Sequence, residues 1–274
     1  MIMSEKHSVL VGATTTGKEA RITIEEPPRI AILGGSGSGK TVLLWNICLV
    51  LAKELKSKVQ FLAEDVKLTS CEPLKSRLCT DIITEPIEVL PMFQKVQQLL
   101  LDRQRYMQEH NLDKIDPYSE LAEQFPMVIV ICEELVSLMN NPELPSTVNK
   151  ALRDWFLTYT TRCRSANMGI ICSSQSYVEA LTIPTAARAQ LTTRFIMRCT
   201  QNDAKLLLEG QDEMAPAHLL SDRGSFYFCD DGDYNVWTKA KTWNTSAADA
   251  TRVASENAIY KRDIGLGWTV DSPF

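Results

Sequence analysis

This chain has few histidines and no pair of cysteines at a spacing typical of metal sites. Its 274 residues include 3 histidines, which lie far apart, and 8 cysteines, none of which form a CxxC pair. Most of the cysteines lie in apolar runs, which is typical of reduced thiols in the core of a cytoplasmic protein. The pattern argues against a zinc site and against a disulfide framework.

Long apolar runs and an excess of positive charge are also lacking. No apolar run approaches the roughly 20 residues that a membrane-spanning helix needs, and residues 1–6 do not form a signal-peptide pattern. We therefore predict a cytoplasmic protein, or one of the host cytoplasm if a phage encodes it, without membrane insertion of its own. The net charge of -5 excludes a global attraction to nucleic acid, so any DNA contact must be local.

Short strands and amphipathic helices alternate along most of the chain. We expect strands at 29–33, 59–65, 127–132, 169–174 and 194–199, helices at 40–56, 88–110, 145–164 and 203–209, and a final pair of strands at 224–230 and 234–240. The continuous apolar run at 127–132 suits a parallel strand that is covered on both faces. This order predicts an α/β fold with a mostly parallel, doubly wound sheet and a C-terminal β-hairpin.

One glycine-rich stretch matches the phosphate-binding pattern GxxxxGK[ST], with an apolar strand before it and a helix after it. Its residues are Gly34, Gly35, Ser36, Gly37, Ser38, Gly39, Lys40 and Thr41. Glycines let backbone N–H groups turn toward phosphate oxygens, and the helix N-terminus adds positive potential. In such a loop Lys40 contacts the β and γ phosphates, and the Thr41 hydroxyl binds Mg²⁺. The sequence therefore predicts ATP and Mg²⁺ as cofactors.

The phosphate-binding loop alone does not separate kinases, GTPases, transporters and motors. The chain has no NKxD-like base reader, no LSGGQ-like signature and no arginine-rich lid. These absences argue against a GTPase, an ABC-type ATPase and a small-molecule kinase.

Two adjacent carboxylates, Glu133 and Glu134, follow the buried strand at 127–132. Open α/β sheets bind ligands at the carboxyl ends of their strands. There Glu133 would help to hold Mg²⁺, and Glu134 would polarise the water that attacks the γ phosphate. Two alternatives stay open. The acids could simply solvate a strand end, or Cys132 could take the metal position, although thiols are poor Mg²⁺ ligands.

The next expected strand ends in the polar run Ser173, Ser174 and Gln175. At that strand end the Gln175 amide could contact the γ phosphate or its water and report hydrolysis. An ordinary polar strand end is the alternative, and the placement of the run favours the catalytic interpretation.

In their order these motifs resemble the FtsK/SpoIIIE family of DNA-translocating P-loop ATPases over most of 29–241. The family's DPK is similar to Asp65-Val66-Lys67, and its DEFADLM is similar to EELVSLM from Glu133 onward. Its GRSAGIHLILATQ aligns without a gap on CRSANMGIICSSQ at 163–175, and its IKANIPTRIAFR resembles ARAQLTTRFIMR at 187–198. The chain departs from the family at Glu133, where Asp is usual.

This resemblance implies a RecA-like core that assembles as a ring, commonly a hexamer, with ATP between subunits and double-stranded DNA in the pore. We expect an N-terminal extension at 1–25, a RecA-like ATPase motor domain at 26–243 and a C-terminal tail at 244–274.

The resemblance also implies an arginine finger that acts on the neighbouring subunit's γ phosphate. Arg164 and Arg194 match family arginines and come first, ahead of Arg162 and Arg198. Pore contacts are expected from 177–190, where Arg188 occupies a position at which the family often has Lys.

The predicted function is an ATP-hydrolysing ring motor that translocates double-stranded DNA, encoded by a mobile element and acting in plasmid transfer or phage genome packaging. The family's membrane helices and winged-helix module are not found, which favours a mobile element, and a relaxase, a portal or a secretion channel would be its partner. Two alternatives remain. One is a related ATPase that recruits or moves protein substrates, which the acidic pI favours; the other is a nucleotide-binding assembly protein with little turnover, suggested by Glu133.

Overall fold

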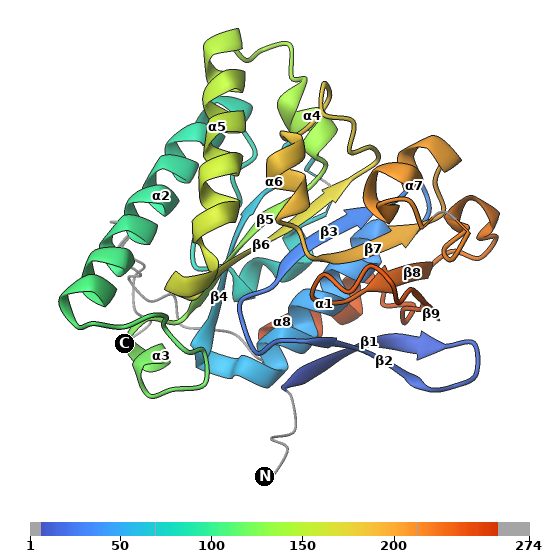
Figure 1. Ribbon diagram of the computed structural model, residues 1–274, viewed down its shortest axis with the longest axis horizontal. Helices are drawn as coiled ribbons and strands as arrows, with labels where there is room; N and C mark the ends of the chain where they lie inside the picture. Colours follow the sequence, from blue (N-terminus) through green and yellow to red (C-terminus); the bar gives the residue numbers. More distant parts are fainter. Residues whose placement is uncertain (1–6, 69, 212, 257–274) are drawn as a thin grey trace.

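The computed structural model describes residues 7–256 except 69 and 212. Within this part of the chain one sheet has the strand order β2-β1-β9-β8-β7-β3-β6-β5-β4 (Figure 1). The strands are β1 (Ser8–Thr14), β2 (Glu19–Thr23), β3 (Arg29–Leu33), β4 (Val59–Glu64), β5 (Met127–Cys132), β6 (Met168–Ser174), β7 (Thr193–Met197), β8 (Ser225–Cys229) and β9 (Thr238–Lys241). Pairing is parallel from β4 to β7 and antiparallel from β7 to β2.

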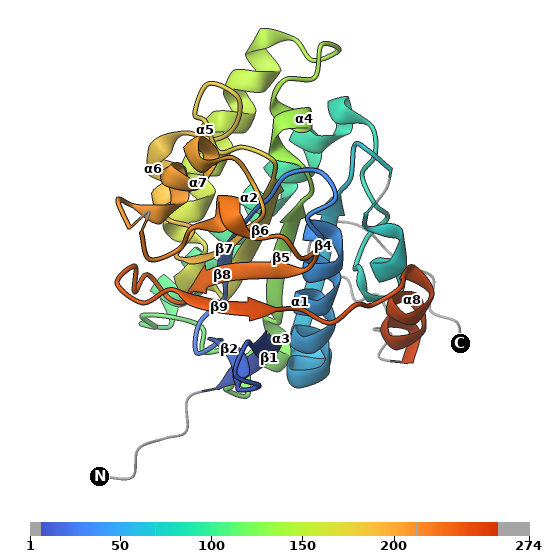
Figure 2. The same ribbon diagram turned by 90° about the vertical axis from the view of Figure 1, so that its right-hand side faces the viewer.

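Helices cover both faces of the parallel part of the sheet (Figure 2). One face carries α1 (Lys40–Leu55) and α8 (Ala247–Glu256). The other carries α2 (Pro86–Glu109), α4 (Leu135–Met139), α5 (Ser146–Arg162), α6 (Thr185–Ala189) and α7 (Gln201–Leu208). Short connections hold α3 (Leu121–Gln124) and the 3-10 turns η1 (Lys56–Lys58), η2 (Glu72–Arg77), η3 (Arg164–Ala166) and η4 (Ala217–Leu219).

The two-layer cover follows from the apolar runs in the strands. Successive side chains of a strand point to opposite faces, so Ile30 and Ile32 pack in the core under α1, whereas Ala31 and Leu33 pack in the core under α2 and α5. All residues of β3 and β5 are buried, as expected for parallel strands that are covered on both sides. The predicted fold class and the hairpin of β8 with β9 are confirmed.

Strand β3 lies between β6 and β7, and β5 lies beyond β6. Parallel pairing places the carboxyl ends of β3, β6, β5 and β4 along one edge of the sheet. The chain reverses its winding direction at β3, which is where doubly wound sheets form their ligand sites. The fold therefore brings four separate sequence segments to one place.

Both ends of the described chain contribute to this fold. Strands β1 and β2 lie in the predicted N-terminal extension, and β1 pairs with β9 in the same sheet. Helix α8 lies in the predicted C-terminal tail and buries Ala250 and Ala254 in the core under α1. Residues 257–274 of that tail lie outside the described residues, and the predicted domain boundaries remain predictions.

None of the helices in the described part of the chain is both long enough and apolar enough to cross a bilayer.

Candidate nucleotide site

The glycine-rich loop joins β3 to α1 in the way that the sequence pattern predicts. Gly37 and Gly39 have φ of 72° and 107°, a region that side chains other than glycine rarely adopt. A Cβ at Gly34 would lie 2.5 Å from Ser38 Oγ.

Neighbouring segments hydrogen-bond to the loop. Gly35 N–H donates to the Arg198 carbonyl at 2.8 Å, and the Ser38 carbonyl accepts from the Gly224 N–H at 2.8 Å. Glycine conformations and backbone contacts thus both define the shape of this loop.

Lys40 points back over this loop from the first turn of α1. Its Nζ donates to the Gly34 carbonyl at 2.7 Å and lies 3.8 Å from Glu134 Oε2. Burial lowers the pKa of Lys40 below its usual range, and the nearby carboxylates of Glu134 and Glu133 oppose that shift. A buried ammonium with one carbonyl partner is well suited to bind a phosphate oxygen.

Glu134 is the N-cap residue of α4 and has a left-handed backbone conformation, with φ of 59° and ψ of 72°. Such a conformation costs a side-chain-bearing residue roughly 1–3 kcal/mol and is concentrated at functional sites. Its Oε1 accepts from the Gln175 N–H at 2.9 Å and from Ser174 Oγ at 3.4 Å. Its Oε2 accepts from Gln175 Nε2 at 3.0 Å and lies 3.3 Å from Lys67 Nζ. The structure thus brings together two predicted catalytic residues, Glu134 and Gln175.

Glu133 and Thr41 are joined through the hydroxyl of Ser70. Ser70 Oγ donates to Glu133 Oε1 at 2.9 Å and lies 3.4 Å from Thr41 Oγ1. Burial raises the pKa of Glu133, and the hydrogen bond from Ser70 partly opposes this shift. Within the part of the chain that is described, the other carboxylate oxygen, Glu133 Oε2, is buried and has no hydrogen-bond partner.

This oxygen set fits Mg²⁺. Mg²⁺ prefers oxygen ligands and is usually held by one or two protein groups together with phosphate oxygens and water. Among the described residues, no group of three or more His, Cys, Asp or Glu side chains could hold a metal ion. The Thr41 hydroxyl and the unpartnered oxygen of Glu133 are the groups that would hold a phosphate-bound ion.

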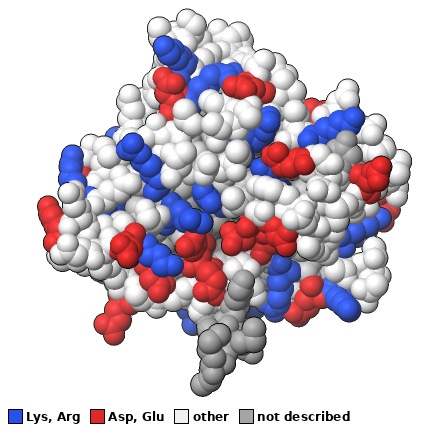
Figure 3. Space-filling view, in the orientation of Figure 1, with Lys and Arg blue, Asp and Glu red and all other residues white. Residues whose placement is uncertain are grey.

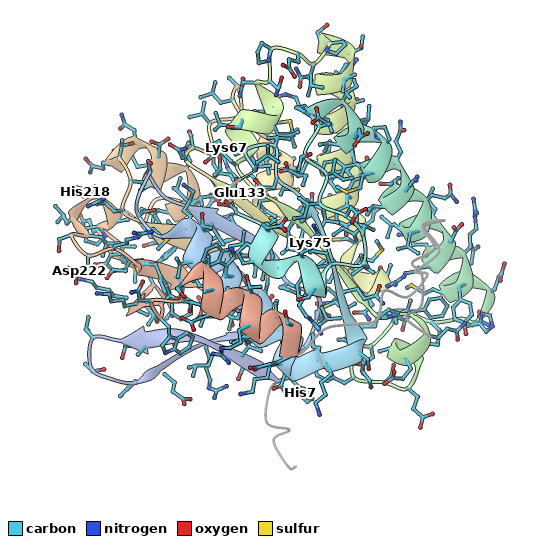
Figure 4. All side chains as sticks on the ribbon, turned by 180° about the vertical axis from the view of Figure 1, so that it is seen from behind. His7, Lys67, Lys75, Glu133, His218 and Asp222 are labelled. Carbon is cyan, nitrogen blue, oxygen red and sulfur yellow. The ribbon has the colours of Figure 1, made fainter. Side chains whose placement is uncertain are left out.

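The segment after β4, which includes the Asp65-Val66-Lys67 motif, makes contacts with the site that the sequence did not predict (Figure 4). Asp65 Oδ2 accepts from the N–H groups of Ser70 and Cys71, each at 2.8 Å, and so shapes the turn that carries Lys67 and Ser70 to the two acids. Glu64, the last residue of β4, is fully buried, and its pKa is well above the usual range because burial and the charge of Glu133 disfavour its anion. The acidic end of this strand, next to β5, was the available signal.

The two favoured arginine-finger candidates lie in different environments. Arg194 on β7 is fully buried within the subunit: Nε donates to the Leu191 carbonyl at 3.0 Å, and one terminal nitrogen donates to the Leu207 carbonyl at 2.7 Å and to Glu209 at 2.9 Å. Its guanidinium also lies over the Tyr234 ring. A finger must reach a neighbouring molecule, and in this arrangement Arg194 has no access to one.

Arg164 is exposed and precedes β6 at its amino end, about 20 Å along the strand from the phosphate-binding loop. It pairs with Glu26 at 3.0 Å and lines a cavity of about 370 Å³ with Arg29 and Lys114. From this end of the sheet it cannot reach its own nucleotide site. Arg162 lies on the exposed last turn of α5, and exposed Arg198 follows β7 beside the loop.

Arg188 lies half-buried on α6. Its guanidinium donates to the Tyr177 carbonyl at 2.8 Å, and burial lowers its pKa. One of its donors therefore holds the loop that precedes it.

Comparisons with known proteins find similar sequences and similar folds. A sequence profile of the FtsK/SpoIIIE family matches residues 2–223. The DNA translocase FtsK of Helicobacter pylori (strain J99 / ATCC 700824) is 29% identical over 140 residues, which cover 48% of this chain and 17% of that protein.

Two solved structures share the fold. The pCW3 conjugation coupling protein TcpA, in its monomer form with ATPγS, has a TM-score of 0.74 at 18% identity, over 92% of this chain and 71% of that chain. The cytoplasmic domain of the type VII secretion ATPase EccC of Thermomonospora curvata has a TM-score of 0.72 at 18% identity, over 97% of this chain and 32% of that chain.

Proposed function

Because this chain belongs to the FtsK/SpoIIIE family, we propose that it is an ATP-hydrolysing ring motor that translocates double-stranded DNA for a mobile element. The observation that carries this proposal is the meeting of Lys40 and Glu134, 3.8 Å apart, with Gln175 hydrogen-bonded to the same carboxylate. A nucleotide-binding loop without hydrolysis would not need a buried carboxylate beside its lysine.

Each residue has a distinct part in hydrolysis. The N–H groups of the loop and Lys40 bind the phosphates of ATP and neutralise charge that develops on the γ phosphate. Thr41 and Glu133 would hold Mg²⁺, which supplies charge neutralisation on the phosphate oxygens. Glu134 accepts a hydrogen bond from the attacking water and orients it. Gln175 is tied to that carboxylate by both its main chain and its side chain, so a change at the γ phosphate would reach β6.

A ring, in this proposal a hexamer, would complete the site. Arg164 lies at the opposite end of the parallel strands from the phosphate-binding loop, which supports a role on the nucleotide site of another copy of the chain. Arginine fingers contribute about 10³ to 10⁵ in rate in P-loop enzymes. Substitution of Arg164 by Ala should therefore lower the rate of the assembled ring but leave nucleotide binding intact.

The DNA contacts would be local. Acidic and basic side chains are interspersed on the face seen in Figure 3, without an extended basic field, and the net charge is -5. Side chains on the inner surface of the ring would then contact the phosphates of duplex DNA. We assign the segment at 177–190, with Arg188, to that inner surface. A relaxase, portal or secretion-channel protein would deliver the DNA.

A second candidate is an ATPase that recruits or moves protein substrates in a secretion or transfer machine. The acidic charge favours it. Binding measured over a range of salt concentrations separates the two, because contacts to DNA phosphates weaken steeply as salt rises.

The proposed function is tested by steady-state ATP hydrolysis with and without long linear duplex. We expect duplex to stimulate turnover of the wild type and Lys40→Ala to abolish turnover in both conditions. Lys53→Ala, on the last turn of α1 and away from the loop, is the matched control and should behave as wild type. Full hydrolysis without DNA that does not change when duplex is added would contradict the proposal.

A further inference from the structure

The carboxylate of Glu134 accepts three hydrogen bonds from protein, and the ammonium groups of Lys67 and Lys40 lie 3.3 Å and 3.8 Å from its Oε2. Oε1 takes the Gln175 N–H and the Ser174 hydroxyl, and Oε2 takes Gln175 Nε2 at 3.0 Å and faces Lys67 Nζ at 3.3 Å. Each carboxylate oxygen offers about two lone pairs. To orient the attacking water, Glu134 must offer one of them to that water, and Lys67 lies beside the position on Oε2 that accepts no hydrogen bond.

From this arrangement we propose that Lys67 is a positioning residue. It keeps the attacking water away from Oε2 of Glu134 until the subunit binds duplex DNA. The inference rests on the proposed function, because it takes Glu134 as the residue that orients water. It adds a residue that restrains the carboxylate rather than one that assists it.

Lys67 is the donor that can leave most readily. Gln175 is fixed by two bonds to Glu134, one of them from its main chain. Among the described residues Lys67 makes a single ion pair, and its side chain is 35% exposed and has a flexible four-carbon stem. The next residue, Leu68, is 72% exposed and has φ of 58°, so the turn lies at the surface, where a partner can reach it.

The second contact from the same turn acts on the other acid. Ser70 Oγ donates to Glu133 Oε1 and lies beside Thr41. The turn after β4 therefore contacts both the water-orienting carboxylate and the metal-side carboxylate. Release of Lys67 exposes one Oε2 lone pair of Glu134 to water, and no covalent change is involved.

The test compares Lys67→Met, which keeps the length of the side chain without its charge, with Lys67→Arg, which keeps the charge. The matched control is Lys75→Met. Lys75 lies on η2 further along the same segment (Figure 4) and pairs only with Glu72, at 3.5 Å among the described residues. The measurements are ATP turnover without duplex, turnover with saturating long duplex, and the Kd of a fluorescent ATP analogue.

We expect Lys67→Met to raise the turnover without duplex about fivefold, the effect of removing a partly exposed ion pair. Turnover with duplex and the Kd should stay near those of the wild type, so that the stimulation ratio falls. Lys67→Arg should restore a low basal rate, and Lys75→Met should match the wild type. A purely structural role for Lys67 would lower both rates and melting temperature together, without rescue by Arg.

Two results would overturn the inference: a basal rate that is unchanged in Lys67→Met, or one that falls in parallel with the duplex-stimulated rate. Failure of the proposed function gives a different result. In that case the wild type would show no stimulation by duplex, while the ratio of basal rates between Lys67→Met and wild type would still report on the restraint.

Discussion

Glu134→Gln is the substitution whose consequences can be worked out most fully from the structure. The new side chain keeps the shape of the old one but replaces one acceptor oxygen by an NH₂ donor. If its remaining oxygen keeps the bond to the Gln175 N–H at 2.9 Å, the new NH₂ faces Gln175 Nε2 and Lys67, which are also donors. Buried groups that lose their partner cost about 1–3 kcal/mol each.

The expected stability loss is therefore roughly 2 kcal/mol, or a fall in melting temperature of about 5 °C. The effect on turnover should be much larger. An amide cannot accept the proton or orient water as a carboxylate does, and loss of a general base lowers rates by about 10² to 10⁴. ATP binding should persist, because the phosphate-binding loop is unchanged.

Steady-state phosphate release, retention of labelled ATP and thermal melting measure these three effects. Glu143→Gln, an exposed carboxylate on the loop before α5, is the matched control and should behave as wild type. A Glu134→Gln protein that retains a third or more of wild-type turnover would refute the assignment of Glu134 as the water-orienting residue.

Three further predictions follow from single contacts. Gly39→Ala should abolish detectable nucleotide binding and destabilise the chain by about 1–3 kcal/mol, because φ is 107° and the new Cβ would lie 3.1 Å from the Gly224 backbone nitrogen. Calorimetric titration measures the nucleotide binding, and thermal melting measures the stability. The pKa of Glu64 is raised well above its usual range in the folded state, so at a pH between the unfolded-state and folded-state pKa the folded chain binds more protons than the unfolded chain. The free energy of unfolding should therefore fall as pH rises, by up to about 1.4 kcal/mol per pH unit. Urea denaturation at several pH values should show a smaller slope for Glu64→Gln. Arg194→Ala should destabilise the chain by about 3 kcal/mol because it leaves buried carbonyls unpaired. Arg164→Ala should change stability by less than about 1 kcal/mol and lower only the rate of the ring. Equal losses of unfolding free energy in the two variants would contradict this prediction.

The sequence predicted the parts of this site that lie within one segment. The strand at 127–132 has the predicted bounds, and the glycine-rich loop lies between a buried strand and a helix as expected. The shared edge for Glu133, Glu134 and Gln175 also follows from sequence, because parallel strands end on the same side. The family resemblance is confirmed by the profile match.

Contacts between distant segments could not be predicted in the same way. Ser70 meets Glu133, and Lys67 meets Glu134, only because β4 pairs with β5 in a register that aligns Glu64 with Cys132. That register and the turn shaped by Asp65 depend on tertiary packing. Arg194 is a further example: a charged residue in a strand indicates exposure from sequence alone, whereas here three carbonyl or carboxylate partners hold it in the core.

In the proposed function, ATP hydrolysis moves duplex DNA through a ring of these subunits. The most direct measurement is displacement of a third DNA strand from the end of a long duplex, followed in time after ATP is added. The wild type should release the third strand, with a delay that grows with the length of duplex to be crossed, and Lys40→Ala and Glu134→Gln should not release it. ATP hydrolysis by the wild type without any release of the strand would contradict the claim.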